Sequence, residues 1–259
     1  MVAAAPPVTQ PHVEATPFGN AIVEGFILDH EPVSKLGYNP DVDADVEDVW
    51  IVGGLYVFPT VKQQMEVISS SANDTSDGTG ARTVKIYYLD DTFTEKDTTV
   101  TLNGTTAVAT TPTDIYRINR FEVATAGTGG VAAGNIDIRN VADTPIYSRI
   151  GTGQTADRDL IYTVPKGKIM YIVQVTYSAG ASSGTPFGRF TLRSTYNNQM
   201  GVVSTLFYPL SEIGVQNGAF TIAYVIPMKF PPRIRHQSSR PVRFRRVEHA
   251  GLMPVQGIC

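Results

Sequence analysis

The stretch ARTVKIYYLD, residues 81–90, alternates apolar and polar side chains, with Val84, Ile86 and Tyr88 at alternate positions. Successive side chains of a β-strand point to opposite faces of the sheet, so this stretch predicts a strand that is buried on one face. Similar short runs follow Trp50, separated by turn residues at intervals of roughly 8 to 12 residues, as in β-sandwiches and barrels. The sequence therefore predicts an all-β protein, an antiparallel two-sheet β-sandwich of jelly-roll type.

The composition supports this fold class. The chain of 259 residues contains 28 Thr and 28 Val but 10 Leu, an excess of β-branched residues that favours sheet over helix. Apolar residues make up 42% and charged residues 17%, which excludes a disordered chain and a multi-span membrane protein. The single cysteine, Cys259, excludes an intrachain disulfide.

Glycine-rich segments mark the predicted connections. Asn103-Gly104 separates two β-like runs and predicts a tight hairpin, because both residues tolerate positive φ. The segment SANDTSDGTGA (71–81) predicts a surface turn, and AGTGGVAAGN (126–135) predicts a flexible connection between strands. A phosphate-binding loop is not favoured for the second segment, because a strand-like run rather than a helix follows it.

A further turn is predicted at Pro165–Gly167, between two strands. In the run after this turn, Ile169, Tyr171, Val173 and Val175 occupy alternate positions and are predicted to share one face of a strand.

The N-terminal region differs from the rest of the chain. Residues 1–48 lack a sustained period, contain six prolines and end in the acidic run DVDADVED, so they predict an extended arm. Within the arm, the apolar segment IVEGFILDH (22–30) is expected to pack against a protein surface. The predicted sandwich spans residues 49–250, and residues 251–259 form a C-terminal tail.

Charge is distributed unevenly along the chain. Residues 1–60 contain nine acids and one base, whereas residues 229–259 contain seven bases and one acid. Arginine pairs well with carboxylates at protein interfaces, so the basic stretch is predicted to contact protein, with the acidic arm of a neighbouring copy as one complement. A solvated outer strand is the alternative. Direct nucleic-acid binding is not expected, because the isoelectric point is near 5.8 and few aromatic residues accompany the arginines.

No motif for catalysis or cofactor binding is evident. The four histidines are too far apart for a zinc-binding pair, and the sequence lacks a GxSxG elbow. Asp41, Asp43 and Asp45 have the opening spacing of a calcium loop, but Val46 and Val52 occupy the positions that need glycine and a bidentate acid. We therefore expect no enzyme activity, no cofactor and no resident metal. A hydrated acidic stretch is the simpler interpretation of the aspartates.

Four ordered blocks resemble a family of tailed-bacteriophage virion proteins, common in cyanophages, that act as capsid cement or decoration proteins. The blocks are EDVWIVGGLYVFP (47–59), SSSANDTSDGTGARTVKIYYLD (69–90), TVTLNGTTAVATTPTDIYRINR (99–120) and IYTVPKGKIMYI (161–172). The resemblance implies a jelly-roll body and a homo-oligomer, expected to be a homotrimer, bound to the major capsid protein on the outer surface of the virion. Synthesis would take place in the host cytoplasm, with no membrane partner.

On this interpretation the contacts with neighbouring subunits come from two segments. The residues predicted to make them are Phe18, Ile22, Phe26, Ile27 and Leu28 in the arm and Arg243, Arg245 and Arg246 near the C-terminus. The alternative is a tail, collar or fibre component in which a sandwich face binds host glycan. Exposed aromatic residues in the loops would favour that alternative, and the glycine-rich loops contain few of them.

Overall fold

The computed structural model describes residues 18–42, 45–180, 187–197, 202–231 and 242–247. Strands make up 49% of this part of the chain and helix makes up 3%. Every strand pair within it is antiparallel. The predicted all-β class with antiparallel sheets is therefore confirmed, and the jelly-roll connectivity stays a prediction.

The chain divides into two compact units, Met1–Ser34 and Lys35–Cys259, which we term the arm and the body. The sequence placed the end of the arm at residue 48, but residues after Ser34 are bonded into the body. Lys35 Nζ lies 2.8 Å from the carboxylate of Asp157. Lys35 is thereby held to the body by its side chain.

The arm contains a short helix that the sequence did not predict, α1 (Phe18–Val23). Its C-terminus is closed by Gly25, whose φ of 73° lies in the left-handed region that favours glycine. The N–H of Phe26 donates to the carbonyl of Ala21 at 2.8 Å, and the N–H of Gly25 donates to Ile22 at 3.0 Å. These two bonds form a Schellman motif, so the arm is not extended throughout.

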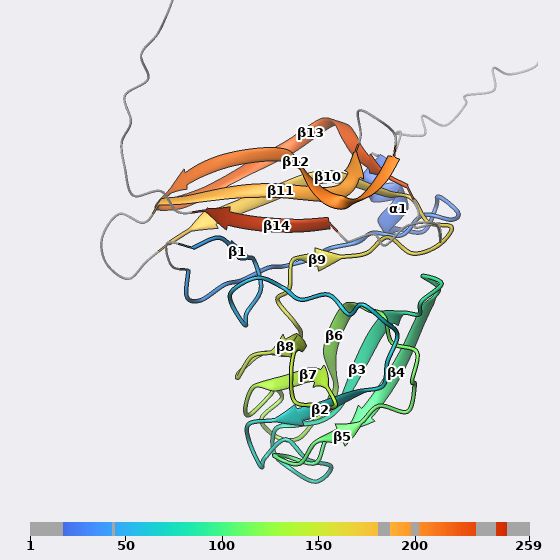
Figure 1. Cartoon of the computed structure of the whole chain (residues 1–259), viewed down its shortest axis with the longest axis vertical. Helices are drawn as coiled ribbons and strands as arrows, with labels where there is room; N and C mark the ends of the chain where they lie inside the picture. Colours follow the sequence, from blue (N-terminus) through green and yellow to red (C-terminus); the bar gives the residue numbers. More distant parts are fainter. Residues whose placement is uncertain (1–17, 43–44, 181–186, 198–201, 232–241, 248–259) are drawn as a thin grey trace, which may run out of the picture. The chain divides into compact units, whose positions relative to one another are not determined.

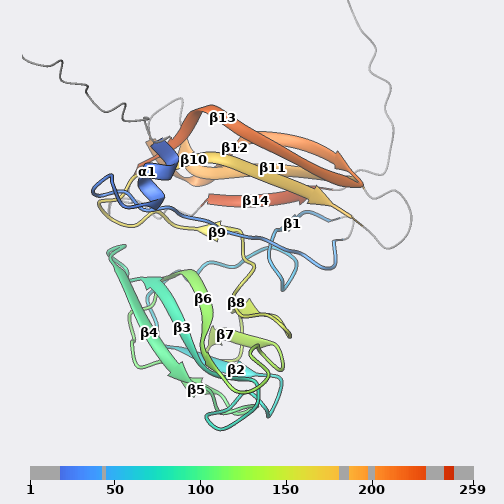
Figure 2. The same cartoon turned by 180° about the vertical axis from the view of Figure 1, so that it is seen from behind.

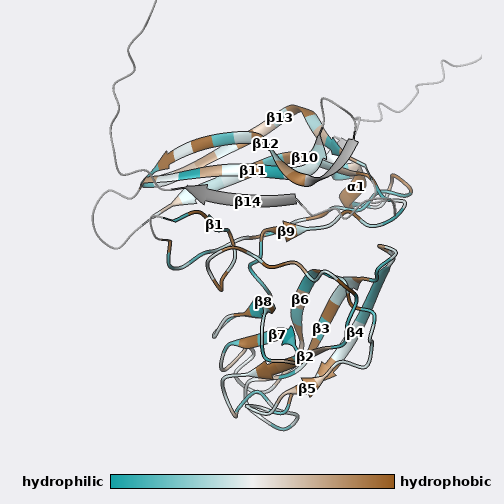
Figure 3. Cartoon of the chain, viewed as in Figure 1, coloured by the Kyte–Doolittle hydropathy of each residue, from teal (hydrophilic) through white to brown (hydrophobic). Residues whose placement is uncertain are grey.

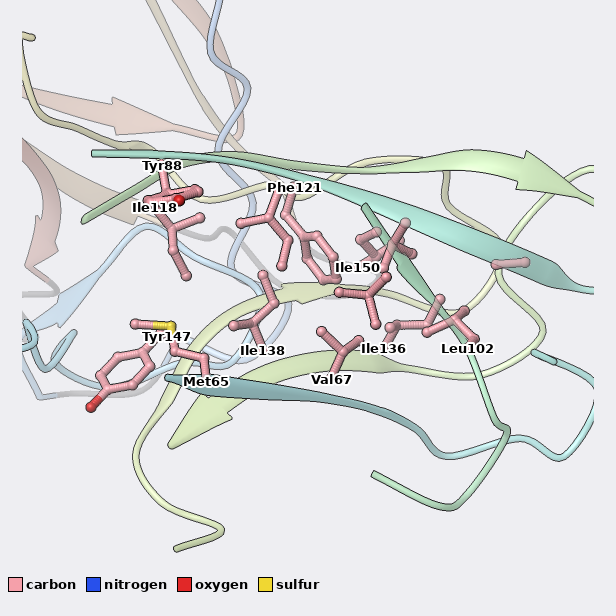
Figure 4. Close-up of a cluster of buried hydrophobic side chains, with 14 of the residues drawn as sticks. Met65, Val67, Tyr88, Leu102, Ile118, Phe121, Ile136, Ile138, Tyr147 and Ile150 are labelled. Carbon is pink, nitrogen blue, oxygen red and sulfur yellow. The ribbon is translucent and has the colours of Figure 1, made fainter. Parts of the chain in front are cut away.

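Seven strands of the body surround one apolar core (Figures 1 and 2). One sheet has the order β5 (Val108–Ala109), β2 (Met65–Ser69), β7 (Ile136–Asn140), β8 (Ile146–Ile150). The other has the order β4 (Glu95–Thr101), β3 (Ala81–Leu89), β6 (Arg117–Ala126). Figure 4 shows side chains such as Met65, Phe121 and Ile138 directed toward one another between the strands.

The strand predicted from residues 81–90 is β3, and its orientation is as expected. Val84, Ile86 and Tyr88 are buried in the core, while the residues between them are partly exposed. Hydrophilic and hydrophobic bands accordingly alternate along the strands in Figure 3.

The hairpin predicted at Asn103-Gly104 is wrong. A turn is present, with Gly104 at a φ of 59°, but the strands before and after it belong to different sheets, since β4 pairs with β3 and β5 pairs with β2. The N–H of Gly104 instead donates to the carbonyl of Asp74 at 2.7 Å. The segment is therefore a crossing between sheets.

The segment 71–81 contains a surface turn, as predicted, and it is bonded to the second glycine-rich segment, which is therefore not a flexible connection. The N–H of Gly127 donates to Gly80 at 2.7 Å, and the N–H of Gly129 donates to Thr79 at 2.8 Å. A Cβ on Gly127 would lie 2.2 Å from a backbone oxygen, so this close approach requires glycine. Asp74, within the first segment, is fully buried beneath these loops.

The remaining strands of the body form two further sheets around a second apolar core. One has the order β1 (Glu47–Asp48), β14 (Val242–Val247), β11 (Phe187–Asn197), β12 (Val202–Gln216), with β9 (Ile161–Tyr162) also paired to β14. The other consists of β10 (Met170–Ala179) and β13 (Gly218–Phe230). Apolar residues from β10, β11, β12 and β13 meet in this core, so the two sheets form a sandwich.

The shared face predicted for Ile169, Tyr171, Val173 and Val175 is only partly correct. The first three residues are exposed, whereas Val175 is buried. The reason is a register shift between Ile172 and Gln174, which moves subsequent residues of β10 to the opposite face.

Candidate interaction surfaces

The arm presents large apolar side chains. Phe26 is 71% exposed and Leu28 is 83% exposed, and Val23 is also exposed. Ile22 and Ile27, which the sequence placed at the same interface, are half-buried. Phe18 begins α1, but its side chain lies outside the described residues. Val23, Phe26 and Leu28 lie within six residues of the chain, and groups of exposed apolar side chains mark binding surfaces in soluble proteins.

The arginines near the C-terminus lie on a strand that is paired on both sides. Residues 245 and 246 of β14 are opposite Asp48 and Glu47 of β1, and β11 pairs along the other side of β14. Arg243 is opposite Ile161 of β9. The arginine side chains lie outside the described residues. Because both backbone edges of β14 are occupied within the chain, this strand is not available for pairing with a neighbouring sheet.

Asp48 joins β1 to the same sheet through a buried ion pair that the sequence did not indicate. Its carboxylate is 3.0 Å from the guanidinium of Arg193 on β11 and accepts the N–H of Tyr56 at 2.8 Å. The Asp48 side chain is inaccessible to solvent. Part of the acidic run at 41–48 is therefore a structural element of the body rather than a free contact surface.

The outer face of β10 and β13 carries an apolar patch, which we define as Tyr171, Val173, Val225 and Ile226. Val225 is 100% exposed and Ile226 is 84% exposed. In the register, Ile172 is opposite Met228 and Gln174 is opposite Ala223, so Val173 faces four residues of β13. This irregularity displaces Val225 and Ile226 from the core. Hydrophobic bands along β13 are visible in Figure 3.

Asp159 is a buried carboxylic acid whose pKa is shifted to near neutrality. Burial raises its pKa from 3.8 to about 7, and the neighbouring carboxylate of Asp157 adds to the rise. The hydroxyl of Ser148 donates to Asp159 at 2.6 Å and, with Lys35, acts in the opposite direction. Because Asp159 is completely buried, a substrate in solution does not reach it.

A second charged cluster lies near the end of β3. Lys96 Nζ is 3.0 Å from Asp90 and 2.7 Å from Asp114. Partial burial opposes ionisation of Asp90, but hydrogen bonds from Thr92 and Lys96 lower its pKa to about 2. The hydrogen bond from Lys96 also lowers the pKa of Asp114. These carboxylates are therefore held in the ionised form, unsuited to exchanging a proton near neutral pH.

Metal-ligating side chains are not clustered in the described part of the chain. It contains no group of three or more His, Cys, Asp or Glu side chains that could hold a metal ion. Asp43, the middle member of the candidate calcium ligands, lies outside the described residues. None of the helical structure in the described ranges is long and apolar enough to cross a bilayer.

No family model, no curated protein and no solved structure matches this chain. Its function must therefore be argued from its own residues and their geometry.

Proposed function

We propose that this chain is a non-enzymatic structural protein of a bacteriophage virion, a cement or decoration protein on the outer surface of the head. It binds across neighbouring major capsid subunits as a homo-oligomer, which we expect to be a homotrimer, and needs no cofactor. The resemblance of four sequence blocks to such proteins supports this assignment, and so does the division of the chain into an arm and a body.

The observation that carries the proposal is the apolar surface of the arm. Val23, Phe26 and Leu28 are exposed in a segment that forms a compact unit apart from the body. Burying a Leu or Phe side chain stabilises a complex by about 1.5–3 kcal/mol relative to leaving it in water. A protein that binds only the assembled shell stabilises that shell by linkage, so such an arm suits a cementing role.

The organisation of the body is consistent with this role. Two apolar cores, the buried pair of Asp48 with Arg193 and the bonded glycine-rich loops fix the sheets internally. Both edges of β14 are paired, which removes one route to uncontrolled sheet-to-sheet association.

The proposal is tested with shells of the encoding phage from which this protein has been removed. Three variants are compared with the full chain in a co-sedimentation assay: a chain beginning at Lys35, a Phe26→Ser/Leu28→Ser variant, and a Val61→Ser/Val141→Ser control at exposed sites on the body. We expect the first two to lose binding and the control to retain it. Undiminished binding by the chain beginning at Lys35 would remove the arm from the mechanism.

Copy number separates the head from the tail. A cement protein on an icosahedral head is expected in roughly hundreds of copies per particle, whereas a tail, collar or fibre component is expected in about a few tens or fewer. Quantitative mass spectrometry of purified particles gives this number. A low count would favour the alternative, a tail-associated protein that binds host glycan.

A further inference from the structure

The apolar patch on β10 and β13 results from a specific irregularity and not from general surface composition. Where β10 has the single residue Val173, β13 has four, and Pro227 is among them. Proline cannot donate to the sheet and is tolerated at such bulges. Val225 and Ile226 are among these extra residues and are exposed, as are Tyr171 and Val173 on the strand paired with β13.

The two strands that carry this patch, with the residues flanking them, contain charges of only one sign. Residues 161–180 and 213–231, which include all of β10 and β13, contain three lysines and no Asp or Glu. Lys229 is directly opposite Tyr171 in the register, so it lies on the same outer face as the patch. A partner for this face should therefore combine apolar side chains with acidic ones.

The arm has this combination. Residues 18–34 contain Glu24, Asp29 and Glu31 and no Lys or Arg, and they expose Phe26 and Leu28. The two surfaces are complementary in hydrophobicity and in charge, and each is exposed in the single chain.

We propose that residues 18–34 of one copy dock on the outer face of β10 and β13 of a second copy. Lys35 is bonded to Asp157 and to the carbonyl of Asn119, both at 2.8 Å, so the root of the arm is fixed to its own body. An arm that docks on a different surface of a neighbour makes a heterologous contact, which closes into a ring when the rotation between copies allows it. This geometry supplies an interface for the homo-oligomer of the proposed function, on which the inference rests, and the arm then supports shell binding by linking the copies that lie on the shell.

The test measures the mass of the free protein by light scattering after gel filtration. Because no shells are present, a failure of the proposed contact between copies is distinguishable from a failure of shell binding. The patch variant is Val225→Ser/Ile226→Ser, the arm variant is Phe26→Ser/Leu28→Ser, and Val61→Ser/Val141→Ser is again the control. We expect the full chain and the control to be oligomeric. Each test variant should dissociate with a Kd raised roughly tenfold or more. Circular dichroism verifies that all variants are folded.

Mixing the variants identifies the occupant of the patch. The patch variant retains an intact arm, and the arm variant retains an intact patch, so a mixture of the two should form heterodimers that neither forms alone. Added salt should weaken these heterodimers, since opposite charges contribute. A mixture that stays monomeric would show that the arm is not the occupant. A monomeric full chain, or a patch variant with unchanged mass, would overturn the proposal.

Discussion

We expect the Asp74→Ala substitution to lower the free energy of unfolding of the body by about 3–5 kcal/mol. The Asp74 carboxylate is fully buried and accepts four hydrogen bonds. Its Oδ1 accepts the N–H groups of Ala81 and Ala133, each at 2.8 Å, and its Oδ2 accepts the N–H of Gly134 at 2.9 Å and the hydroxyl of Ser69 at 2.6 Å. Alanine removes every one of these acceptors.

The magnitude follows from the donors that remain. A buried donor that loses its acceptor costs about 1–3 kcal/mol, and three backbone N–H groups are affected here. The hydroxyl of Ser69 rotates to another partner at little cost, and water entering the vacated space recovers part of the loss. These corrections reduce the sum to the stated range.

Asp74→Asn should be milder, costing about 1–3 kcal/mol, because one oxygen is kept. If the amide nitrogen replaced Oδ1, it would face the N–H groups of Ala81 and Ala133. If it replaced Oδ2, it would face the N–H of Gly134 and a Ser69 hydroxyl that can turn to accept. The second orientation leaves one mismatch and is preferred. The control is the substitution Asp77→Ala, at an exposed aspartate of the same loop. Its free energy of unfolding should lie within about 0.5 kcal/mol of that of the native chain.

Urea unfolding monitored by circular dichroism measures these changes from the midpoint and slope. The single tryptophan, Trp50, is buried in a different cluster from the core beneath Asp74, so its fluorescence tests whether the body unfolds in one transition. An Asp74→Ala chain within about 1 kcal/mol of the native one would refute this account. An asparagine variant that is less stable than the alanine variant would also contradict it.

Three further changes test other buried features of the body. Since folding raises the pKa of Asp159 to about 7, the folded state holds this proton more tightly, and stability should fall as pH rises from about 4 to about 7. Asp159→Asn should remove this loss. Its free energy of unfolding, measured with urea across the pH range, should exceed that of the native chain by up to about 4 kcal/mol at pH 8 and should equal it at pH 3. Arg193→Ala leaves the Asp48 carboxylate buried without the guanidinium that pairs with it, and should lower the free energy of unfolding by about 3 kcal/mol, as measured by thermal unfolding. Adding Asp48→Asn should recover part of this loss. Gly127→Ala should lower the free energy of unfolding by about 2 kcal/mol or more, because its Cβ would meet a backbone oxygen. Gly180→Ala has open space around its Cβ and should leave the free energy of unfolding unchanged; thermal unfolding measures both.

Features set by local alternation could be predicted from the sequence. The buried face of β3 follows from the order of residues 83–88, because a strand with one buried face needs only that pattern. Turns at Gly104 and Gly167 were also predictable, since both glycines have positive φ. The end of α1, which the sequence-based prediction missed, also carries a local signal, a glycine shortly after an apolar run.

Features set by distant partners could not be predicted in this way. The choice of β3 rather than β5 as the partner of β4 depends on residues far apart in the chain. Asp74 resembles the other polar residues of its loop, and only the approach of residues 133 and 134 shows that it is buried. The apolar patch depends on a mismatch in length between β10 and β13, for which Pro227 was the only local indication.

The strength of the proposed arm contact constrains how it can function. A few apolar side chains contribute about 1.5–3 kcal/mol each when fully buried, and association costs an estimated 4–15 kcal/mol in lost translational and rotational freedom. One arm on one patch is therefore a weaker contact than a closed ring, and the heterodimers of mixed variants should need a higher protein concentration than the oligomer of the full chain. In a closed ring, or on a shell that already holds the copies close together, each further contact becomes intramolecular and its effective concentration rises. Such an arm joins free copies in the closed ring and engages more firmly on a shell, where further neighbours are present, which suits a protein that stabilises an assembled surface.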